Sequence, residues 1–264
     1  MENAGMNHTH LEDGCRLAWR MEGPQHAPVL VLAHALGASS VMWQPQAAAL
    51  GDQFRVLRYD SRGHGASDIT PGPYSIEQLG RDVLGLIDAL GLEKVSFCGL
   101  SMGGFVGQWL GANAPHRLHR LVLANTAAYM GPPEAWTARI ETALQQGMAA
   151  VAEGALARWF TPSYLEAEPE AVERIRQVIL ANAPQGYAAC AAAIAVMDQR
   201  QSLRKITVPT LVIGGSEDPA TPLACAEELH AAIPDSRLAV LQAAHLSNIE
   251  QADRFNALLR EFLP

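Results

Sequence analysis

The sequence predicts an α/β protein with a mostly parallel central sheet, helices on both faces of that sheet, and a helical cap inserted after the sixth strand. Short β runs alternate with helical patterns through residues 29–124 and again from residue 209, which is typical of parallel sheets covered by helices. Between residues 131 and 200 the alternation stops and no convincing strand is found. We therefore expect a core of residues 1–130 and 201–264, with the cap at 131–200.

Short apolar runs predict the strands of the core. Residues 29–33 are continuously apolar, which indicates a strand buried on both faces of the sheet. Further strands are expected at 54–59, 95–98, 121–124, 209–214 and 237–241. Because helical patterns separate many of these runs, we expect most neighbouring strands to be parallel.

Apolar side chains at helical spacing predict the helices of the core. Five of them fall on one face between Ser75 and Leu90, where Ser75 and Gln78 form a capping-box start and Gly91 is a typical stop. Another helix is expected from the glycine-rich turn after residue 98 through Leu110. A last helix carries four apolar residues on one side: Phe255, Leu258, Leu259 and Phe262.

The expected cap is rich in alanine and punctuated by prolines. Residues 131–200 contain 18 alanines, and prolines stand at positions 132, 133, 162, 169 and 184. Alanine favours helix, whereas proline cannot continue one from within. We expect several helices joined by sharp corners, packed on the core and closing over a site.

Length and charge exclude several classes of protein. The chain has 264 residues, 49% of them hydrophobic, which suits one large domain with a modest insertion. It carries 19 basic and 27 acidic residues, a net charge of −8 with histidine neutral. With no run rich in lysine and arginine, we expect neither a nucleic-acid partner nor an anionic membrane surface.

The start of the chain, the short length of its apolar runs and its scattered cysteines suggest a cytoplasmic enzyme. The start, Met1-Glu2-Asn3-Ala4-Gly5, lacks the basic and apolar regions of a secretory leader, and no apolar run reaches the roughly eighteen residues of a membrane span. The cysteines form neither a C-x-x-C motif nor a cluster with histidine, so we expect reduced thiols and no metal site. They are Cys15, Cys98, Cys190 and Cys225.

The strongest local motif is Gly99-Leu100-Ser101-Met102-Gly103. It follows the strand that ends at Cys98 and opens a helix near Gly104, which is the placement that a nucleophile elbow requires. Such a turn holds Ser101 in a strained conformation, and the two flanking glycines prevent clashes. The simpler interpretation is a glycine-rich turn between strand and helix with an incidental serine, and the placement favours the elbow over it.

A serine nucleophile needs a base and a carboxylate that orients the base. His245 lies on the loop after the last strand, where the sheet topology places the base. The carboxylate can follow either of two strands. Asn125 follows the earlier strand, whereas Asp218 follows the later one, so Asp218 is the candidate and its neighbour Glu217 is the alternative. The predicted catalytic residues are Ser101, Asp218 and His245.

Two backbone N–H groups are expected to form an oxyanion hole, where charge develops on the substrate carbonyl. Met102 should supply one, at the start of a helix whose dipole also favours negative charge. The loop after residues 29–33 should supply the other, and we assign it to Leu36. His34 and His64 also lie in loops at strand ends and are interpreted as structural residues that bond to the backbone.

These features together resemble the α/β-hydrolase fold family over nearly the whole chain, with nucleophile, acid and base in the order of that family. A narrower resemblance is to the 3-oxoadipate enol-lactonases, which act in the β-ketoadipate pathway of bacterial aromatic degradation. It rests on four stretches, residues 97–104, 158–162, 186–190 and 245–250. Two of these lie in the expected cap, so they carry information about the substrate.

The resemblance implies that Ser101 opens the lactone ring of 3-oxoadipate enol-lactone, and that water then releases 3-oxoadipate from an acyl-enzyme. It implies no cofactor and no metal. Since this substrate is a small anion, a protein of charge −8 must hold it with a local donor. The cap offers five arginines: Arg139, Arg158, Arg174, Arg176 and Arg200. The predicted substrate-binding residues are Trp136, Arg139, Trp159 and Tyr187.

Two other functions stay open on the sequence alone. A general carboxylesterase, or a lactonase for another small ester, would share the catalytic residues and differ only in the cap. A binding protein of this fold without turnover is disfavoured by the complete set of Ser101, Asp218 and His245. The sequence does not decide the oligomeric state, and a homo-oligomer is left open.

Overall fold

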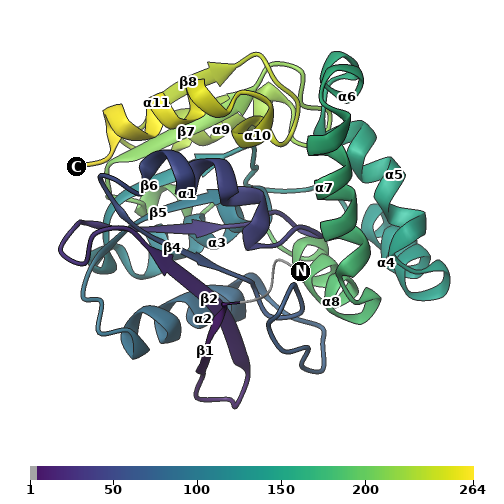
Figure 1. The fold of residues 1–264 in the computed structure, drawn as a ribbon, viewed down its shortest axis with the longest axis horizontal. Coiled ribbons are helices and arrows are strands. Elements are labelled where there is room, and N and C mark those ends of the chain that lie inside the picture. The colour runs from purple at the N-terminus through teal and green to yellow at the C-terminus, as the bar shows by residue number, and fades with distance from the viewer. Residues whose placement is uncertain (1–4) are drawn as a thin grey trace.

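The computed structural model describes residues 5–264, which fold around an eight-stranded sheet with helices on both sides (Figure 1). The strand order is β1-β2-β4-β3-β5-β6-β7-β8. β2 pairs antiparallel with β1 and with β4, whereas the remaining neighbours are parallel. The bounds are β1 Asn7–His10, β2 Arg16–Glu22, β3 Val29–Ala33, β4 Arg55–Tyr59, β5 Val95–Leu100, β6 Leu118–Ala124, β7 Thr210–Gly215 and β8 Arg237–Leu241.

Helices cover both faces of the sheet, as the sequence predicts. The chain moves one way along the sheet through α1 and the other way through α2, and right-handed crossovers therefore place these helices on opposite faces. α11 packs beside α1, and α3 packs beside α2. The helices of the two layers are α1 Gln44–Leu50, α2 Ile76–Ala89, α3 Met102–Asn113, α9 Leu223–Ala232, α10 Ser247–Glu250 and α11 Ala252–Phe262.

The predicted elements agree with the structure except near their ends. β3 and β8 have the predicted bounds, β5 continues to Leu100, and β6 already begins at Leu118. At the start of α2 the Ser75 hydroxyl accepts a hydrogen bond from the Gln78 amide, and Gly91 follows the helix with a φ of 66°.

Several elements were not predicted. β1 and β2 form an edge hairpin in which many residues are exposed or half-buried, so they lack the apolar runs of the central strands. α1 has seven residues, too few to show a helical period clearly. α9 has only two fully buried residues, Ala226 and Leu229, which is too weak a stripe to recognise.

Five helices lie between β6 and β7 and stand together beyond one end of the sheet (Figure 1). They agree with the helical character predicted for residues 131–200, whose division into a separate cap stays a prediction. Three of them begin on the predicted prolines, which fit the first helical position. These cap helices are α4 Glu134–Gln146, α5 Met148–Trp159, α6 Pro162–Ala167, α7 Pro169–Ala181 and α8 Pro184–Ala195.

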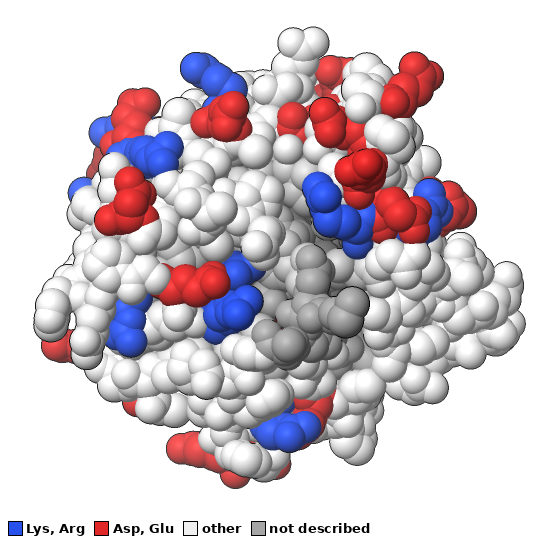
Figure 2. Space-filling model, in the orientation of Figure 1, with Lys and Arg blue, Asp and Glu red and all other residues white. Residues whose placement is uncertain are grey.

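No single helix of the described chain is long and apolar enough to cross a membrane, and α7 and α8 reach such a length only as a pair bent by 94°. On the face shown in Figure 2, apart from the grey residues, basic and acidic side chains are interspersed. Met1–Ala4, on which the prediction of no secretory leader partly rests, lie outside the described residues.

Candidate active site

Ser101 stands at the turn between β5 and α3, in the strained conformation that the motif predicts. Its φ is 57° and its ψ is −113°, a combination that costs energy for a residue with a side chain. The turn is tight enough to require glycine on both sides. A Cβ on Gly99 would lie 2.0 Å from the Gly103 carbonyl oxygen, and one on Gly103 would lie 2.2 Å from the Ala33 oxygen.

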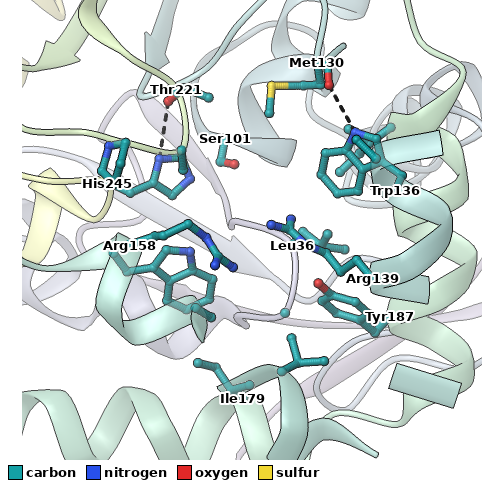
Figure 3. Close-up of a pocket in the computed structure, with 18 of the residues that line it drawn as sticks. Leu36, Ser101, Met130, Trp136, Arg139, Arg158, Ile179, Tyr187, Thr221 and His245 are labelled. Atoms are coloured by element: carbon teal, nitrogen blue, oxygen red, sulfur yellow. Dashed lines mark hydrogen bonds between the residues drawn. The ribbon is translucent and has the colours of Figure 1, made fainter. Parts of the chain in front are cut away.

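His245 and Asp218 form a buried pair beside Ser101. His245 Nδ1 lies 2.8 Å from Asp218 Oδ2, and the two side chains are almost fully buried. The carboxylate can only accept, so Nδ1 carries the proton and Nε2 is left free to act as a base. Figure 3 shows the imidazole between Thr221 and Ser101. The structure thus brings together the three residues that the sequence predicts as catalytic.

Asp218 accepts several hydrogen bonds that favour its ionised form. The Thr221 hydroxyl donates to Oδ2 at 2.7 Å, and the Ala220 and Thr221 amides donate to Oδ1 at 2.8 and 3.0 Å. Burial alone would raise the pKa of Asp218. The attraction of His245 and the hydrogen bonds from His245, Asn125 and Thr221 outweigh burial, so the pKa lies below its ordinary value.

Asn125 supports this pair and was not predicted to do so. Its amide donates to Asp218 Oδ2 at 3.0 Å and to the Ala244 carbonyl at 3.2 Å, while the Ser247 hydroxyl donates to its side-chain oxygen. It therefore links the loop of the acid to the loop of the base. Its φ of 43° is in the left-handed region, which asparagine tolerates better than most residues. Its position after β6, where the acid was first sought, is the sequence feature that points to it.

Glu217, the alternative acid, does not contact His245. Its side chain lines a separate surface groove with Thr161 and Glu250, while His245 bonds to Asp218. Glu250 itself accepts hydrogen bonds from the Ala244 amide and from the Thr161 hydroxyl, so it holds the loop of His245 against the start of α6. The geometry favours Asp218 over Glu217.

The amides predicted for the oxyanion hole lie beside Ser101. Leu36 lines the same cavity as Ser101, and Met102 is the first residue of α3. In the described part of the chain neither amide has a hydrogen-bond acceptor, whereas the neighbouring Gly37 and Gly103 amides are bonded to His64 and to the His34 carbonyl. Both N–H groups are therefore available to a substrate oxygen.

His34 and His64 are buried and hold two loops together. His34 Nε2 accepts from the Ser61 amide and His64 Nε2 accepts from the Gly37 amide, each at 2.9 Å. Burial is the main cause that lowers the pKa of both residues, to about 3 for His64, where the neighbouring His34 adds to the effect. Both rings are neutral in the folded protein, as structural histidines that bond to backbone should be.

A cavity of about 230 Å³ opens from Ser101 and His245 into the cap helices. All four predicted substrate-binding residues line it, namely Trp136, Arg139, Trp159 and Tyr187. Arg158 lines it too, although only Arg139 was selected among the cap arginines. Figure 3 shows both guanidinium groups directed inward below Ser101. Apolar side chains form much of the remaining wall: Leu36, Phe105, Met130, Val151, Ala155, Ile179 and Ile194.

The two cavity arginines have no carboxylate partner within residues 5–264. Arg139 lies 4.8 Å from the centroid of the Trp136 ring, and its positive charge opposes the rise in the pKa of Tyr187 that burial causes. Burial, and then repulsion from Arg139, lowers the pKa of Arg158. Two uncompensated positive charges in one largely enclosed space favour an anionic ligand.

The other cap arginines lie outside the cavity. Arg176 pairs with Glu153 and Glu173, and Arg200 pairs with Asp198. Arg174 is not among the residues that line the cavity. Charge compensation therefore separates Arg176 and Arg200 from the two arginines that face the site, whereas Arg174 differs from them by its position outside the cavity.

Metal ligands do not cluster in the described residues. Across 5–264, no group of three or more histidine, cysteine, aspartate or glutamate side chains is placed to hold a metal ion. The chemistry that the described side chains can support is nucleophilic attack by a serine, with an imidazole as base.

Comparison with known proteins gives the family. The family profile described as alpha/beta hydrolase fold matches residues 28–252. The chain belongs to the α/β-hydrolase fold family. The matched region contains all three predicted catalytic residues and the cap helices.

Relatives within this family include enol-lactonases and a carbamate hydrolase. Two proteins of Acinetobacter baylyi named 3-oxoadipate enol-lactonase 2 and 1 are 44% and 38% identical to the chain. The first match covers 89% of this chain and 88% of the relative, and the second covers 95% and 94%. A relative of Stutzerimonas stutzeri that bears the name carbamate hydrolase RutD is 30% identical, over 90% of this chain and 92% of the relative.

A solved structure of an enol-lactonase is also similar to this chain. The enol-lactonase from Burkholderia xenovorans LB400 superimposes with a TM-score of 0.95 at 46% identity, covering 97% of this chain and 99% of that chain. This hydrolase-fold protein is therefore an enzyme of the hydrolase class, with enol-lactonases among its relatives.

Proposed function

We propose that this hydrolase opens the lactone ring of 3-oxoadipate enol-lactone to give 3-oxoadipate. The pair Arg139 and Arg158 carries the proposal, because two unpaired guanidinium groups share a cavity with Ser101 and His245. The enol-lactone bears a carboxylate remote from its reactive carbonyl, so it supplies the anion that these charges favour. The names of the relatives from Acinetobacter baylyi and Burkholderia xenovorans support the same substrate.

The proposed reaction begins with formation of a tetrahedral intermediate. His245 Nε2 takes the Ser101 proton while Ser101 Oγ attacks the lactone carbonyl carbon. The Leu36 and Met102 amides then bind the oxyanion of the tetrahedral intermediate. Asp218, held ionised by its hydrogen bonds, stabilises the imidazolium that forms on His245.

Collapse of this intermediate gives the acyl-enzyme, which water then hydrolyses to release the product. The ring C–O bond breaks, and the leaving group is an enolate rather than an ordinary alkoxide, so it leaves readily and tautomerises to a ketone on protonation. His245 supplies that proton. It next removes a proton from water, which attacks the acyl-enzyme and frees the second carboxylate as Ser101 regains its hydrogen. Lactone and water are consumed, and 3-oxoadipate is the product.

The cap helices set the proposed specificity. Arg139, which lies over the Trp136 ring, and Arg158 line the same cavity and can both donate to the free carboxylate of the substrate. The arginines hold the anion at one end of the cavity, and Ser101 reacts at the other. We further propose a cytoplasmic location and a small anionic lactone as the binding partner.

A turnover panel tests the proposal. Purified protein is given freshly generated 3-oxoadipate enol-lactone, a p-nitrophenyl ester, a saturated uncharged γ-lactone and a small carbamate. We expect kcat/KM for the enol-lactone to exceed the values for the other three substrates, and Ser101→Ala to abolish all turnover. Efficient ester or carbamate hydrolysis with negligible action on the enol-lactone would contradict the proposal and favour a general esterase or a carbamate hydrolase.

A further inference from the structure

The side chain of Asn182 joins three separate segments of the chain. Asn182 ends α7 at the corner before α8 and is 5% exposed. Its amide nitrogen donates to the Gly37 carbonyl at 2.8 Å and to the Val178 carbonyl of its own helix at 2.9 Å. Its oxygen accepts from the Gly65 amide at 3.1 Å. One buried amide thus ties the cap corner to the loops that follow β3 and β4.

Gly37 is held from three sides. Its amide donates to His64 Nε2 at 2.9 Å, and its carbonyl accepts from Asn182. Its φ is 78°, and a Cβ at this position would lie 3.2 Å from the Tyr187 ring. Two of these three constraints, Asn182 and Tyr187, come from the cap, so the cap fixes the peptide groups around Gly37.

The constraint on Gly37 reaches the Leu36 amide through Ala38. The Gly37 carbonyl and the Ala38 amide belong to one peptide unit, and the Ala38 amide donates to the Ala35 carbonyl at 3.0 Å. The Ala35 carbonyl in turn shares a peptide unit with the Leu36 N–H. In a trans peptide these two groups point in opposite directions, so holding the carbonyl aims the N–H. His34 Nδ1 donates to the same carbonyl at 2.8 Å and reinforces its direction.

We propose that Asn182 is a positioning residue for the oxyanion hole, acting through Gly37 and Ala38 on the Leu36 amide. The inference rests on the proposed serine-hydrolase mechanism but not on the enol-lactone as substrate. The cap of this enzyme then contributes in two ways. Its arginines bind the substrate, and its α7–α8 corner orients the Leu36 amide toward the oxyanion of the transition state.

The corner itself is docked by backbone contacts that do not involve Asn182. Gly186 of α8 packs so closely on Gly63 that a Cβ would lie 2.0 Å from the Gly63 oxygen. The Tyr74 amide donates to the Ala189 carbonyl at 3.2 Å. Removal of the Asn182 amide should therefore leave the corner in place and free only the loop of Gly37.

Asn182→Ala and Asn182→Asp test the proposal. Aspartate keeps the acceptor for the Gly65 amide but cannot donate to the Gly37 carbonyl. We measure kcat and KM on a p-nitrophenyl ester and on the enol-lactone, the inhibition constant of a trifluoromethyl ketone, and the dissociation constant of adipate. The ketone forms a hemiketal whose oxyanion fills the hole, whereas adipate binds without an oxyanion.

Both variants should lose about 10- to 100-fold in kcat and in affinity for the trifluoromethyl ketone, the range expected when a catalytic group is displaced by about 1 Å. KM and adipate affinity should change by less than about threefold, since ground-state contacts are untouched. If Asn182→Ala yields no folded protein, Asn182→Asp carries the test. The ester arm needs no lactone, so failure to turn over the enol-lactone would count against the proposed function alone.

Asn113→Ala is the matched control. Asn113 also ends a helix and donates to the carbonyl four residues earlier, at 2.8 Å from Trp109, but its bond is exposed. It should keep wild-type values throughout. Wild-type kcat and ketone affinity in the Asn182 variants would overturn the proposal. So would equal losses of ketone and adipate affinity, because a general disturbance of the pocket predicts no preference for the transition state.

Discussion

Replacement of either cavity arginine by methionine should weaken turnover of an anionic lactone and spare that of an uncharged one. Methionine keeps much of the apolar stem of arginine, so the change removes charge and hydrogen bonds more than packing. Arg139 and Arg158 both lie at the cavity, half-buried and without carboxylate partners in the described chain. The perturbation therefore acts on ligand binding rather than on an internal ion pair.

The size of the effect follows from the environment of the two charges. A hydrogen bond to a charged group contributes about 1.5–3 kcal/mol, and the lower part of that range applies because both side chains are partly exposed. A loss of about 1.5–2 kcal/mol corresponds to roughly 10- to 30-fold in kcat/KM. The two losses should not simply add in the double variant, since the remaining guanidinium partly replaces the missing one.

The assay compares kcat/KM for the enol-lactone with that for a saturated, uncharged γ-lactone. We expect the 10- to 30-fold loss on the first substrate and less than about threefold on the second. Arg176→Met is the control, because Arg176 already pairs with Glu153 and Glu173 away from the cavity. Equal losses on the charged and uncharged lactones, or no loss on either, would refute the assignment of the carboxylate to these arginines.

Three further predictions concern Asp218, Asn125 and His64. Asp218→Asn should lower kcat by about 10⁴-fold, because an amide favours the wrong tautomer of His245; a loss below tenfold on any hydrolysed ester would exclude the predicted acid. Asn125→Ala and Asn125→Gly should both lower kcat by about tenfold, as for a lost hydrogen bond to a charged group. Asn125→Ala should in addition lose about 1 kcal/mol of unfolding free energy relative to Asn125→Gly, because alanine is strained at the left-handed φ of this position. Equal urea midpoints for the two variants would contradict that strain. Burial lowers the pKa of His64 to about 3, so the unfolded chain takes up a proton below about pH 6.5 while the folded chain does not. Stability should then fall as the pH drops from 7 to 5, by up to about 1.4 kcal/mol per unit below pH 6.5. His64→Asn should flatten that dependence in urea titrations and the exposed His119→Asn far less, and identical slopes in wild type and His64→Asn would contradict it.

The sequence predicts the central sheet well, because parallel strands buried on both faces are nearly continuous apolar runs. β3, β5 and β7 are buried almost throughout and appear as apolar runs. The edge strands β1 and β2 are partly exposed, so packing does not impose the same pattern on them. What a sequence predicts about secondary structure depends here on how many faces of an element are covered.

The residues of the site also differ in how far the sequence predicts them. Ser101 and His245 are predictable because the turn of the elbow and the loop after the last strand have fixed places in the topology. Arg158 could be named as a cap arginine but not chosen, since its lack of an ion-pair partner is a property of the packed helices and not of the sequence. Asn125 and Asn182 act through backbone groups far away in the chain, and hydrogen bonds across 93 and 145 residues have no local pattern.

The unfavourable net charge is compatible with an anionic substrate because charges act over different distances. Exposed charges more than about 10 Å away are screened at moderate salt, so the excess of 8 negative charges mainly reduces the rate of encounter. Arg139 and Arg158 act within the cavity, where screening is weak and where burial and mutual repulsion already lower the pKa of Arg158. Binding of a carboxylate compensates for the burial and mutual repulsion of these two charges. An anionic substrate would therefore gain affinity from a positive site that the protein builds at some expense to its own stability. Adipate should then raise the melting temperature of the wild type more than that of an Arg158→Met variant.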